Sequence, residues 1–252
     1  VLFRSFLEQV MSPDGAYFTI AEPPYKEYIE PRELRRMSKV LRNGLVSAKI
    51  ALEESDLDNP DAILTGTGLG CATDTEKFLM AMDENKETLL TQTSFIQSTH
   101  NTLGGSIAIG LSCHNYNMTY VNRGFSLESA LLDAQLMMEG GEIENALVGG
   151  FDEMTPDHVK LLRTTDQYHP NYGAKPGQGA GFFVLDSKLH EHSYAQYKDL
   201  KTLYRPSIAD LEQHLKDLID THHIDVEKLV VLMGNNGIEA EEKLYHHLEN
   251  KV

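Results

Sequence analysis

The sequence predicts a layered α/β fold in which helices cover a mostly parallel sheet. Short apolar segments, each long enough for one strand, alternate along the chain with longer segments whose apolar residues recur at helical spacing. Glycines stand at the points where strands turn into helices, and no low-complexity linker divides the chain. This alternation favours parallel strands joined by helices. We expect a single domain over residues 12–252, and we interpret residues 1–11 as an expression scar or a fragment edge.

The expected elements follow from the spacing of apolar residues and from the glycines between them. One helical segment, 101–112, is rich in glycine and other small residues that permit close backbone approach, so we expect it to be deeply buried. Another, 126–139, ends at Gly140–Gly141 as a C-cap would. The expected helices are 31–57, 74–83, 101–112, 126–139, 207–221 and 239–249. The expected strands lie in 61–70, 118–122, 145–153, 181–185 and 228–233.

Composition excludes several classes of protein. The formal net charge of −16 over 252 residues argues against a general nucleic-acid binder, which needs a basic surface. The two cysteines, Cys71 and Cys113, form neither a disulfide framework nor a metal-ligand pattern, which favours a reducing cytosol. The eleven histidines show no metal-binding spacing, and no apolar run is long enough to span a membrane. We therefore expect a cytoplasmic protein without a metal site.

Two motifs could carry chemistry. A strand followed by "GTGLG" at 66–70 could hold phosphate on backbone N–H groups, but it lacks the GxGxxG spacing of a dinucleotide site, so a tight turn is the better interpretation. The segment "TYVNRGFSLESALLDA", residues 119–134, predicts a strand, a sharp turn at Gly124 and a helix, an arrangement that places a nucleophile at a helix N-terminus. Ser126 resembles the serine of a G-x-S-x-G elbow, but Glu128 replaces the last glycine, and an N-cap role is simpler.

Four segments in order resemble the β-ketoacyl-ACP synthase branch of the thiolase-like family. They are "ILTGTGLG" (63–70), "TSFIQSTHNTLGGSIAIGLSCHNYNMTYVNRG" (93–124), "SALLDAQLMMEGGEIENALVGGFDEMTP" (129–156) and "PGQGAGFFVLDS" (176–187). The resemblance covers roughly residues 30–250 and implies a thiolase-like αβα fold with a mostly parallel mixed sheet, ending about two-thirds of the way along such a protein. Within the family, the chain looks most similar to the chain-length-factor-type proteins of aryl-polyene and flexirubin pigment clusters.

The resemblance also identifies where the chain departs from the family. Gly124 occupies the position of the acyl-accepting cysteine, and an offset of one would place Phe125 there. Gly234 or Asn235 stands where the family has its first histidine, and the block that would carry the second is not reached. The resemblance further implies a vestigial pocket, for which the candidate residues are Asn101, Arg123, Ser126, Gly149, Gly150 and Gln178, the last in place of the usual glutamate.

Two hypotheses about function follow. The first is a synthase-like protein without its own nucleophile, acting as a chain-length-factor-type partner in fatty-acid or polyketide elongation. The resemblance implies acyl carrier protein as a partner, a homodimer or a heterodimer with an active synthase across helix 101–112, and no cofactor, because the carrier's acyl-phosphopantetheine is the substrate. The second hypothesis is an active acyltransferase that uses Cys71, Cys113 or Ser126 as an unconventional nucleophile.

Overall fold

The computed structural model describes residues 17–88, 90–164, 176–191, 193–232, 234 and 239–249. The predicted fragment edge at 1–11 and the candidate Asn235 lie outside these residues. The helices are α2 (Tyr25–Tyr28), α3 (Pro31–Leu34), α4 (Lys39–Ser55), α5 (Ala72–Glu84), α6 (Gln92–Gln97), α7 (Thr102–Leu111), α8 (Ser126–Glu139), α9 (Pro156–Thr164), α10 (Ile208–Thr221) and α11 (Glu239–Glu249), with 3₁₀ turns η1 (Arg123–Phe125) and η2 (Val226–Lys228). The strands are β1 (Ala62–Gly66), β2 (Tyr116–Tyr120), β3 (Asn145–Asp152) and β4 (Gly179–Asp186).

The four strands form one mixed sheet in the order β2-β1-β3-β4. β1 pairs in parallel with β2 and β3, whereas β4 runs antiparallel to β3. The register places Gly66 opposite Tyr120 on one side and Gly150 on the other. The carboxyl ends of the three parallel strands therefore meet at one edge of the sheet.

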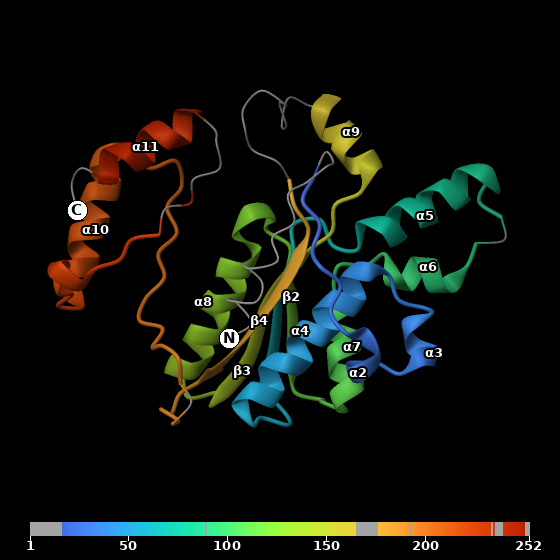
Figure 1. The fold of residues 1–252 in the computed structure, drawn as a ribbon, viewed down its shortest axis with the longest axis horizontal. Helices are drawn as coiled ribbons and strands as arrows, with labels where there is room; N and C mark the ends of the chain where they lie inside the picture. Colours follow the sequence, from blue (N-terminus) through green and yellow to red (C-terminus); the bar gives the residue numbers. More distant parts are fainter. Residues whose placement is uncertain are drawn as a thin grey trace. The chain divides into compact units, whose positions relative to one another are not determined.

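Helices cover both faces of this sheet, as the sequence predicts (Figure 1). On one face, α4 and α7 pack with Ile63 and Leu147 into a core whose members are almost fully buried. On the other face, α8 presents Ala130 and Ala134 to Leu64 and its strand neighbours. Successive strand residues point to opposite faces, so β1 contributes to both cores and all five of its residues are buried. The αβα layering is confirmed.

Two expectations about helices are corrected by the structure. The single helix expected over 31–57 is two helices, because Ser38 is extended and acts as the N-cap of α4. The expectation of a deeply buried helix at 101–112 is wrong for this chain: Leu103 and Ile107 of α7 are buried, but Ile109 is 82% exposed. The apolar residues of α7 are spread around the helix, and α4 and the sheet cover one side of it.

The chain divides into two compact units. Unit 1 comprises Val1–Lys160 and Pro176–Tyr194, and unit 2 comprises Leu161–Lys175 and Ala195–Val252. Unit 2 contains α10 and α11, both at the expected positions. The strand expected over 228–233 is absent from its described residues, where Val230 and Leu232 are exposed, because a strand needs a neighbour to pair with. The single domain over 12–252 stays a prediction, since two compact units can belong to one domain.

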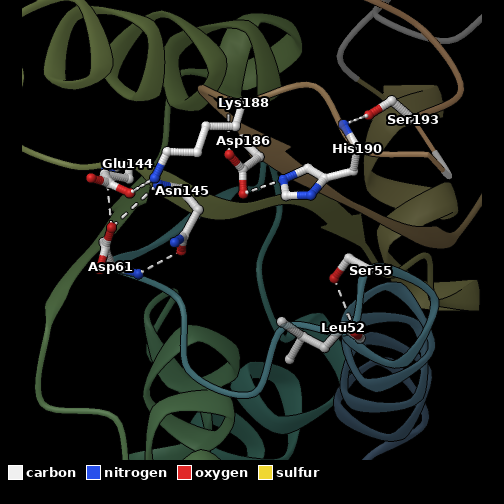
Figure 2. A network of polar contacts seen from close by, with 9 residues as sticks. All are labelled: Leu52, Ser55, Asp61, Glu144, Asn145, Asp186, Lys188, His190 and Ser193. Atoms are coloured by element: carbon white, nitrogen blue, oxygen red, sulfur yellow. Dashed lines mark hydrogen bonds and ion pairs between the residues drawn. The ribbon is translucent and has the colours of Figure 1, made fainter.

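A polar network joins the sheet ends that lie opposite the carboxyl ends of the parallel strands (Figure 2). The Asp61 carboxylate accepts the main-chain N–H groups of Glu144 and Asn145, and the Asn145 side chain accepts the N–H of Asp61 in return. Lys188 pairs with Glu144 beyond the end of β4. These reciprocal bonds hold β1 and β3 in register at their first residues. Among the described helices, none is long and apolar enough to cross a membrane.

Candidate functional site

The candidate site lies at the carboxyl ends of β1, β2 and β3, where the chain turns from strand to helix three times. The β2–α8 turn contains Arg123, whose φ of 53° is in the left-handed region, whereas Gly124 is absent from the residues with positive φ. The sharp turn predicted at Gly124 is therefore made by its neighbour. Left-handed backbone costs a non-glycine residue about 1–2 kcal/mol, so other contacts must hold this turn.

Ser126 supplies those contacts. Its side chain is 3% exposed, and its Oγ accepts the main-chain N–H of Asn122 at 2.8 Å. The same hydroxyl lies 2.8 Å from the carbonyl oxygen of Thr67 and 2.7 Å from that of Arg123, which share its single hydrogen. The helix begins at Ser126, with Phe125 as N-cap, so the expected N-cap role of Ser126 is wrong. Ser126 instead ties the β2–α8 turn to the end of β1.

The end of β1 approaches α8 so closely that only glycine fits. A Cβ added to Gly66 would lie 2.4 Å from the carbonyl carbon of Ser126 and 2.5 Å from the nitrogen of Leu127. At Gly124, by contrast, a Cβ would meet no atom within 4 Å. The position that the resemblance assigns to a nucleophile is thus open to a side chain, and Arg123 and Phe125 beside it are exposed.

The glycine-rich segment 67–70 is organised by an acidic residue that sequence reasoning did not select. Asp152 Oδ1 accepts hydrogen bonds from Thr67 Oγ1 at 2.9 Å, Gly68 N at 2.9 Å and Leu69 N at 2.7 Å. The backbone N–H groups that could have held a phosphate are therefore used within the protein. The signal in the sequence was the acidic pair Asp152–Glu153, which stands at the end of the strand that contains Gly149 and Gly150. This geometry supports the tight-turn interpretation of "GTGLG".

The remaining candidates come from several parts of the chain and do not form one cluster. A Cβ on Gly149 would lie 2.2 Å from the Phe182 ring, so this glycine makes room for an aromatic side chain of β4. Gly150 pairs with Gly66, and its Cβ position is in ordinary contact distance of Leu127. Gln178 lines a cavity of about 530 Å³ in unit 1, together with Tyr25, Asn43 and Glu153, whereas the five other pocket candidates do not line it. Asn101 is exposed and precedes α7, and Gly234 belongs to unit 2.

The two cysteines lie inside the protein. Cys71 is fully buried, and burial, with the nearby Asp74 and Glu153 charges, raises the pKa of its thiol to about 12. Cys113 is 6% exposed, and its Sγ lies 3.5 Å from the carbonyl oxygen of Pro60. A nucleophilic cysteine needs an accessible thiolate. Cys71 meets neither requirement, because its thiol is inaccessible and its raised pKa keeps it protonated.

A histidine and two potential partners occur near the end of β4, but they do not form a nucleophile triad. The His190 ring lies 3.1 Å from Asp186, with 57% of the histidine side chain exposed. Ser193 Oγ accepts the main-chain N–H of His190 and not a ring atom, and in Figure 2 it lies on the far side of His190 from Asp186. Without a hydroxyl held by the imidazole, this set cannot activate a nucleophile.

The fold and this edge define a class of protein: a layered α/β protein in which a strand–turn–helix lies at the carboxyl edge of a mixed sheet. A family profile described as "Beta-ketoacyl synthase, N-terminal domain" matches residues 21–190. The chain belongs to this family. None of the curated proteins compared with the chain matches it.

Solved structures support the same fold. A β-ketoacyl synthase from Burkholderia phymatum STM815 is 16% identical, with a TM-score of 0.60, and the match covers 90% of this chain and 64% of that one. The ketosynthase ApeO in complex with its chain length factor ApeC, from Xenorhabdus doucetiae, is 17% identical, with a TM-score of 0.51 and coverage of 64% and 62%. AntDE:AntF, a type II polyketide synthase acyl-carrier protein in complex with its ketosynthase, is 18% identical, with a TM-score of 0.56 and coverage of 67% and 52%. The chain thus spans less than two thirds of the length of each.

Proposed function

We propose that this chain is a β-ketoacyl-synthase-like subunit without condensing chemistry of its own, which pairs with an active synthase as a chain-length-factor-type partner. One observation carries the proposal. The chain keeps the strand–turn–helix of the family, but the turn holds Gly124, and both of its cysteines are buried in other parts of the fold. Condensation through a thioester requires a thiolate at the helix N-terminus, and glycine has no group that can accept an acyl chain.

The alternative, an acyltransferase with an unconventional nucleophile, is disfavoured by burial. Cys71 is protonated at physiological pH, since the pKa of its thiol is raised to about 12. The Ser126 hydroxyl is buried and engaged by main-chain groups on three sides. Moving it to attack a substrate would release the bonds that hold the left-handed turn at Arg123.

The surface at β2 and α7 supports pairing with a second subunit. β2 is the edge strand of the sheet, and Met118 and Val121, in and just after it, are 41% and 50% exposed. Ile109 of α7, which packs beside β2, is 82% exposed. An edge strand flanked by exposed apolar side chains is suited to pairing with another chain. The complex of ApeO with its chain length factor, and that of a type II polyketide synthase acyl-carrier protein with its ketosynthase, suggest a synthase and an acyl carrier protein as partners.

Condensation of acyl- and malonyl-carrier-protein substrates tests the proposal. The purified chain alone should give no product, whereas its addition to a matching synthase, sought first in the neighbouring gene, should change the rate or the product length. Robust turnover by the chain alone would refute the proposal. So would a covalent acyl adduct on Cys71, Cys113 or Ser126, detected by mass spectrometry after incubation with an acyl thioester.

Two variants test the nucleophile position itself. Gly124→Cys should fold, because the added atoms meet open space, and should gain an acyl adduct on the new thiol. Gly124→Ala is the matched control, which should fold equally well and acquire no adduct. Denatured protein serves as the control for the acyl thioester, because all of its thiols are accessible. If the folded Gly124→Cys variant stays unmodified while the denatured protein is acylated, Gly124 does not occupy the acyl-accepting position.

The pairing surface has its own test. Ile109→Lys should leave the stability of the chain within about 0.5 kcal/mol, because surface substitutions have small effects, while weakening association with the synthase at least tenfold. Leu189→Lys, at another apolar side chain that is 89% exposed, is the control and should leave association unchanged. Equal association of both variants, measured by analytical ultracentrifugation, would place the interface elsewhere.

A further inference from the structure

A cavity of about 530 Å³ lies beside the loop that joins β3 to α9 in unit 1. We call it the Glu153 cavity, after the buried acidic residue of that loop. Its lining also includes Tyr25 of α2, Asn43 of α4, Lys77 of α5 and Gln178, which precedes β4. No motif in the sequence pointed to this cavity as a whole, because its residues come from separate segments of the chain.

The walls of the Glu153 cavity are tied to one another by hydrogen bonds. Tyr25 Oη donates to Asn43 Oδ1 at 2.6 Å, which joins α2 to α4. The main-chain N–H of Thr73, at the start of α5, donates to Glu153 Oε2 at 2.8 Å, which joins α5 to the loop after β3. The contacts that hold these walls in place are therefore made within the chain itself.

Most charged side chains in the lining are already engaged. Lys39 Nζ lies 2.7 Å from Glu22 Oε1, so these two charges offset one another. The guanidinium group of Arg42 lies 5.9 Å from the centre of the Tyr25 ring, within range of a cation–π contact. In the described part of the chain, the charged lining residues with neither an ion pair nor a ring contact are Glu153 and Lys77.

Glu153 is a buried carboxylate without a cationic partner in contact. It is 4% exposed, and burial raises the pKa of its carboxyl, while the main-chain N–H of Thr73 acts in the opposite direction. Its Oε1 accepts no hydrogen bond from the described residues and is not among their inaccessible atoms, so a molecule in the cavity can reach it. Buried charges are usually paired. A cation in the cavity would supply the contact that Glu153 lacks.

Lys77 provides the opposite charge close by. Its charge lowers the pKa of Glu153, so the two groups are near enough to interact, yet no ion pair joins them among the described residues. A molecule with an ammonium group at one end and a carboxylate at the other can lie between them and contact both. Met37 and Met154 also line the cavity and offer an apolar wall to the rest of such a molecule.

We propose that the Glu153 cavity binds a small zwitterion of the amino-acid type, whose ammonium group pairs with Glu153 and whose carboxylate pairs with Lys77. Amide groups of Asn43 and Gln178, in the same lining, can donate further hydrogen bonds to the carboxylate. A molecule with a single charge makes only one of the two ionic contacts. The inference does not depend on the proposed function, because the cavity contains no residue of the β2–α8 turn.

Calorimetric titration of the full chain at pH 7, without any synthase, tests the site. The probes are L-leucine, 6-aminohexanoate, 3-methylbutylamine, which is leucine without its carboxylate, and 4-methylpentanoate, which is leucine without its amine. At least one zwitterion should bind tenfold or more tightly than both single-charge probes, and the tighter zwitterion shows the spacing of the charges. Absence of zwitterion binding at millimolar concentration would overturn the proposal, as would equally tight binding of a single-charge probe.

Charge-matched variants separate a built site from general attraction of ions. Glu153→Gln keeps an oxygen that can accept the N–H of Thr73 but removes the charge, so it should weaken zwitterion binding at least tenfold and leave 4-methylpentanoate bound as tightly or more tightly. Glu27→Gln removes the same charge from α2, at an exposed residue that does not line the cavity, and should leave binding unchanged. Equal weakening by both variants would show that the attraction is non-specific.

The carboxylate contact has its own variant. Lys77 is exposed, so Lys77→Gln should fold even if Glu153→Gln does not, as judged by circular dichroism. It should weaken zwitterion binding at least tenfold and leave 3-methylbutylamine bound as tightly or more tightly. Lys26→Gln, at an exposed residue of α2 outside the cavity, is its control. Unchanged zwitterion binding in Lys77→Gln would refute the proposed bridge.

The pH dependence of binding gives an independent readout. Protonation removes the charge of Glu153, and burial raises its pKa above the ordinary value of 4.5, so affinity should already fall as the pH is lowered from 7 towards 4.5. Glu153→Gln should lack this fall, whereas Asp74 and Lys77, which also act on Glu153, are present in both proteins. The same fall in both proteins would refute pairing of the ammonium group with Glu153.

Discussion

At the scale of single residues, the left-handed backbone conformation of the β2–α8 turn lies at Arg123, although the sequence led us to expect the sharp turn at Gly124. Arg123 adopts the left-handed backbone that glycine usually provides, while Gly124 does not. The cost of that conformation is offset by Ser126, whose buried hydroxyl bonds the backbone on both sides of the turn. The turn thus has a defined shape that does not depend on a side chain at Gly124.

Cys71 gives the first prediction, on pH dependence. Burial raises the pKa of its thiol to about 12, whereas an unfolded cysteine ionises near pH 8.5. Between these values the native thiol stays protonated and the unfolded one does not, so the free energy of unfolding should fall as the pH rises from about 9 towards 12. The measurement is urea unfolding at pH 8, 9 and 10.

The control for this prediction is Cys71→Ala, which should show a weaker decline over the same pH range. Tyr25, whose pKa is also raised to about 12 by burial, is present in both proteins and cancels in the comparison. In the native chain at pH 8, Cys71 should also resist iodoacetamide until denaturant is added. Identical pH profiles of the two proteins would contradict the assignment of the effect to this thiol.

At the scale of elements, the contact between β1 and α8 depends on one missing side chain. Gly66→Ala would place a methyl group 2.4 Å from backbone atoms of Ser126, which cannot move without breaking the start of α8. We expect a loss of stability of about 3 kcal/mol or more, at the upper end of the range for overpacked cores. Chemical denaturation checks this value.

Gly105→Ala is the matched control for Gly66→Ala. It adds the same methyl group inside α7, where no atom lies within 4 Å, and alanine is the better helix former by about 1 kcal/mol. This variant should be as stable as the native chain or more stable. Equal destabilisation by both substitutions would show that close approach at Gly66 is not the cause.

The longer helices and the paired strands were predictable from periodicity, whereas the short helices α2, α6 and α9 were not expected. The bounds of α8 are those expected from the sequence, and β1 to β4 each lie within two residues of the expected segments, because their apolar spacing reports directly on burial. The strand expected over 228–233 failed for the opposite reason. An apolar run indicates that a segment can be buried, but pairing depends on a neighbouring strand, which the local sequence does not specify.

At the scale of the whole molecule, burial is distributed unequally between the two units. All of the buried hydrophobic residues lie in unit 1, whereas in the described part of unit 2 no residue is buried. Unit 2 has the Ser207–Asp210 capping box of α10 and contacts such as His247 with Glu212 at 2.7 Å between α11 and α10. Such surface interactions contribute little stability compared with a core.

This inequality predicts unfolding in steps. Hydrogen exchange measured by mass spectrometry should show α10 and α11 opening at low free energy, and the amides of β1 and β3 exchanging last. Addition of a synthase partner that binds β2 and α7 should slow exchange there and leave α10 unchanged. A single cooperative loss of protection over the whole chain would contradict the prediction.

The sequence by itself determined the class of fold and the order of the paired strands, because these depend on local periodicity and on matching segments in order. That Gly124 stands at the family's nucleophile position stays a prediction from the resemblance. Only the tertiary structure decided that Asp152 closes the glycine-rich turn, that Cys71 and Ser126 are buried, and that Ile109 is exposed. Burial and contact join residues that are far apart in the chain, and no local pattern of apolar or charged residues records which distant segment will cover them.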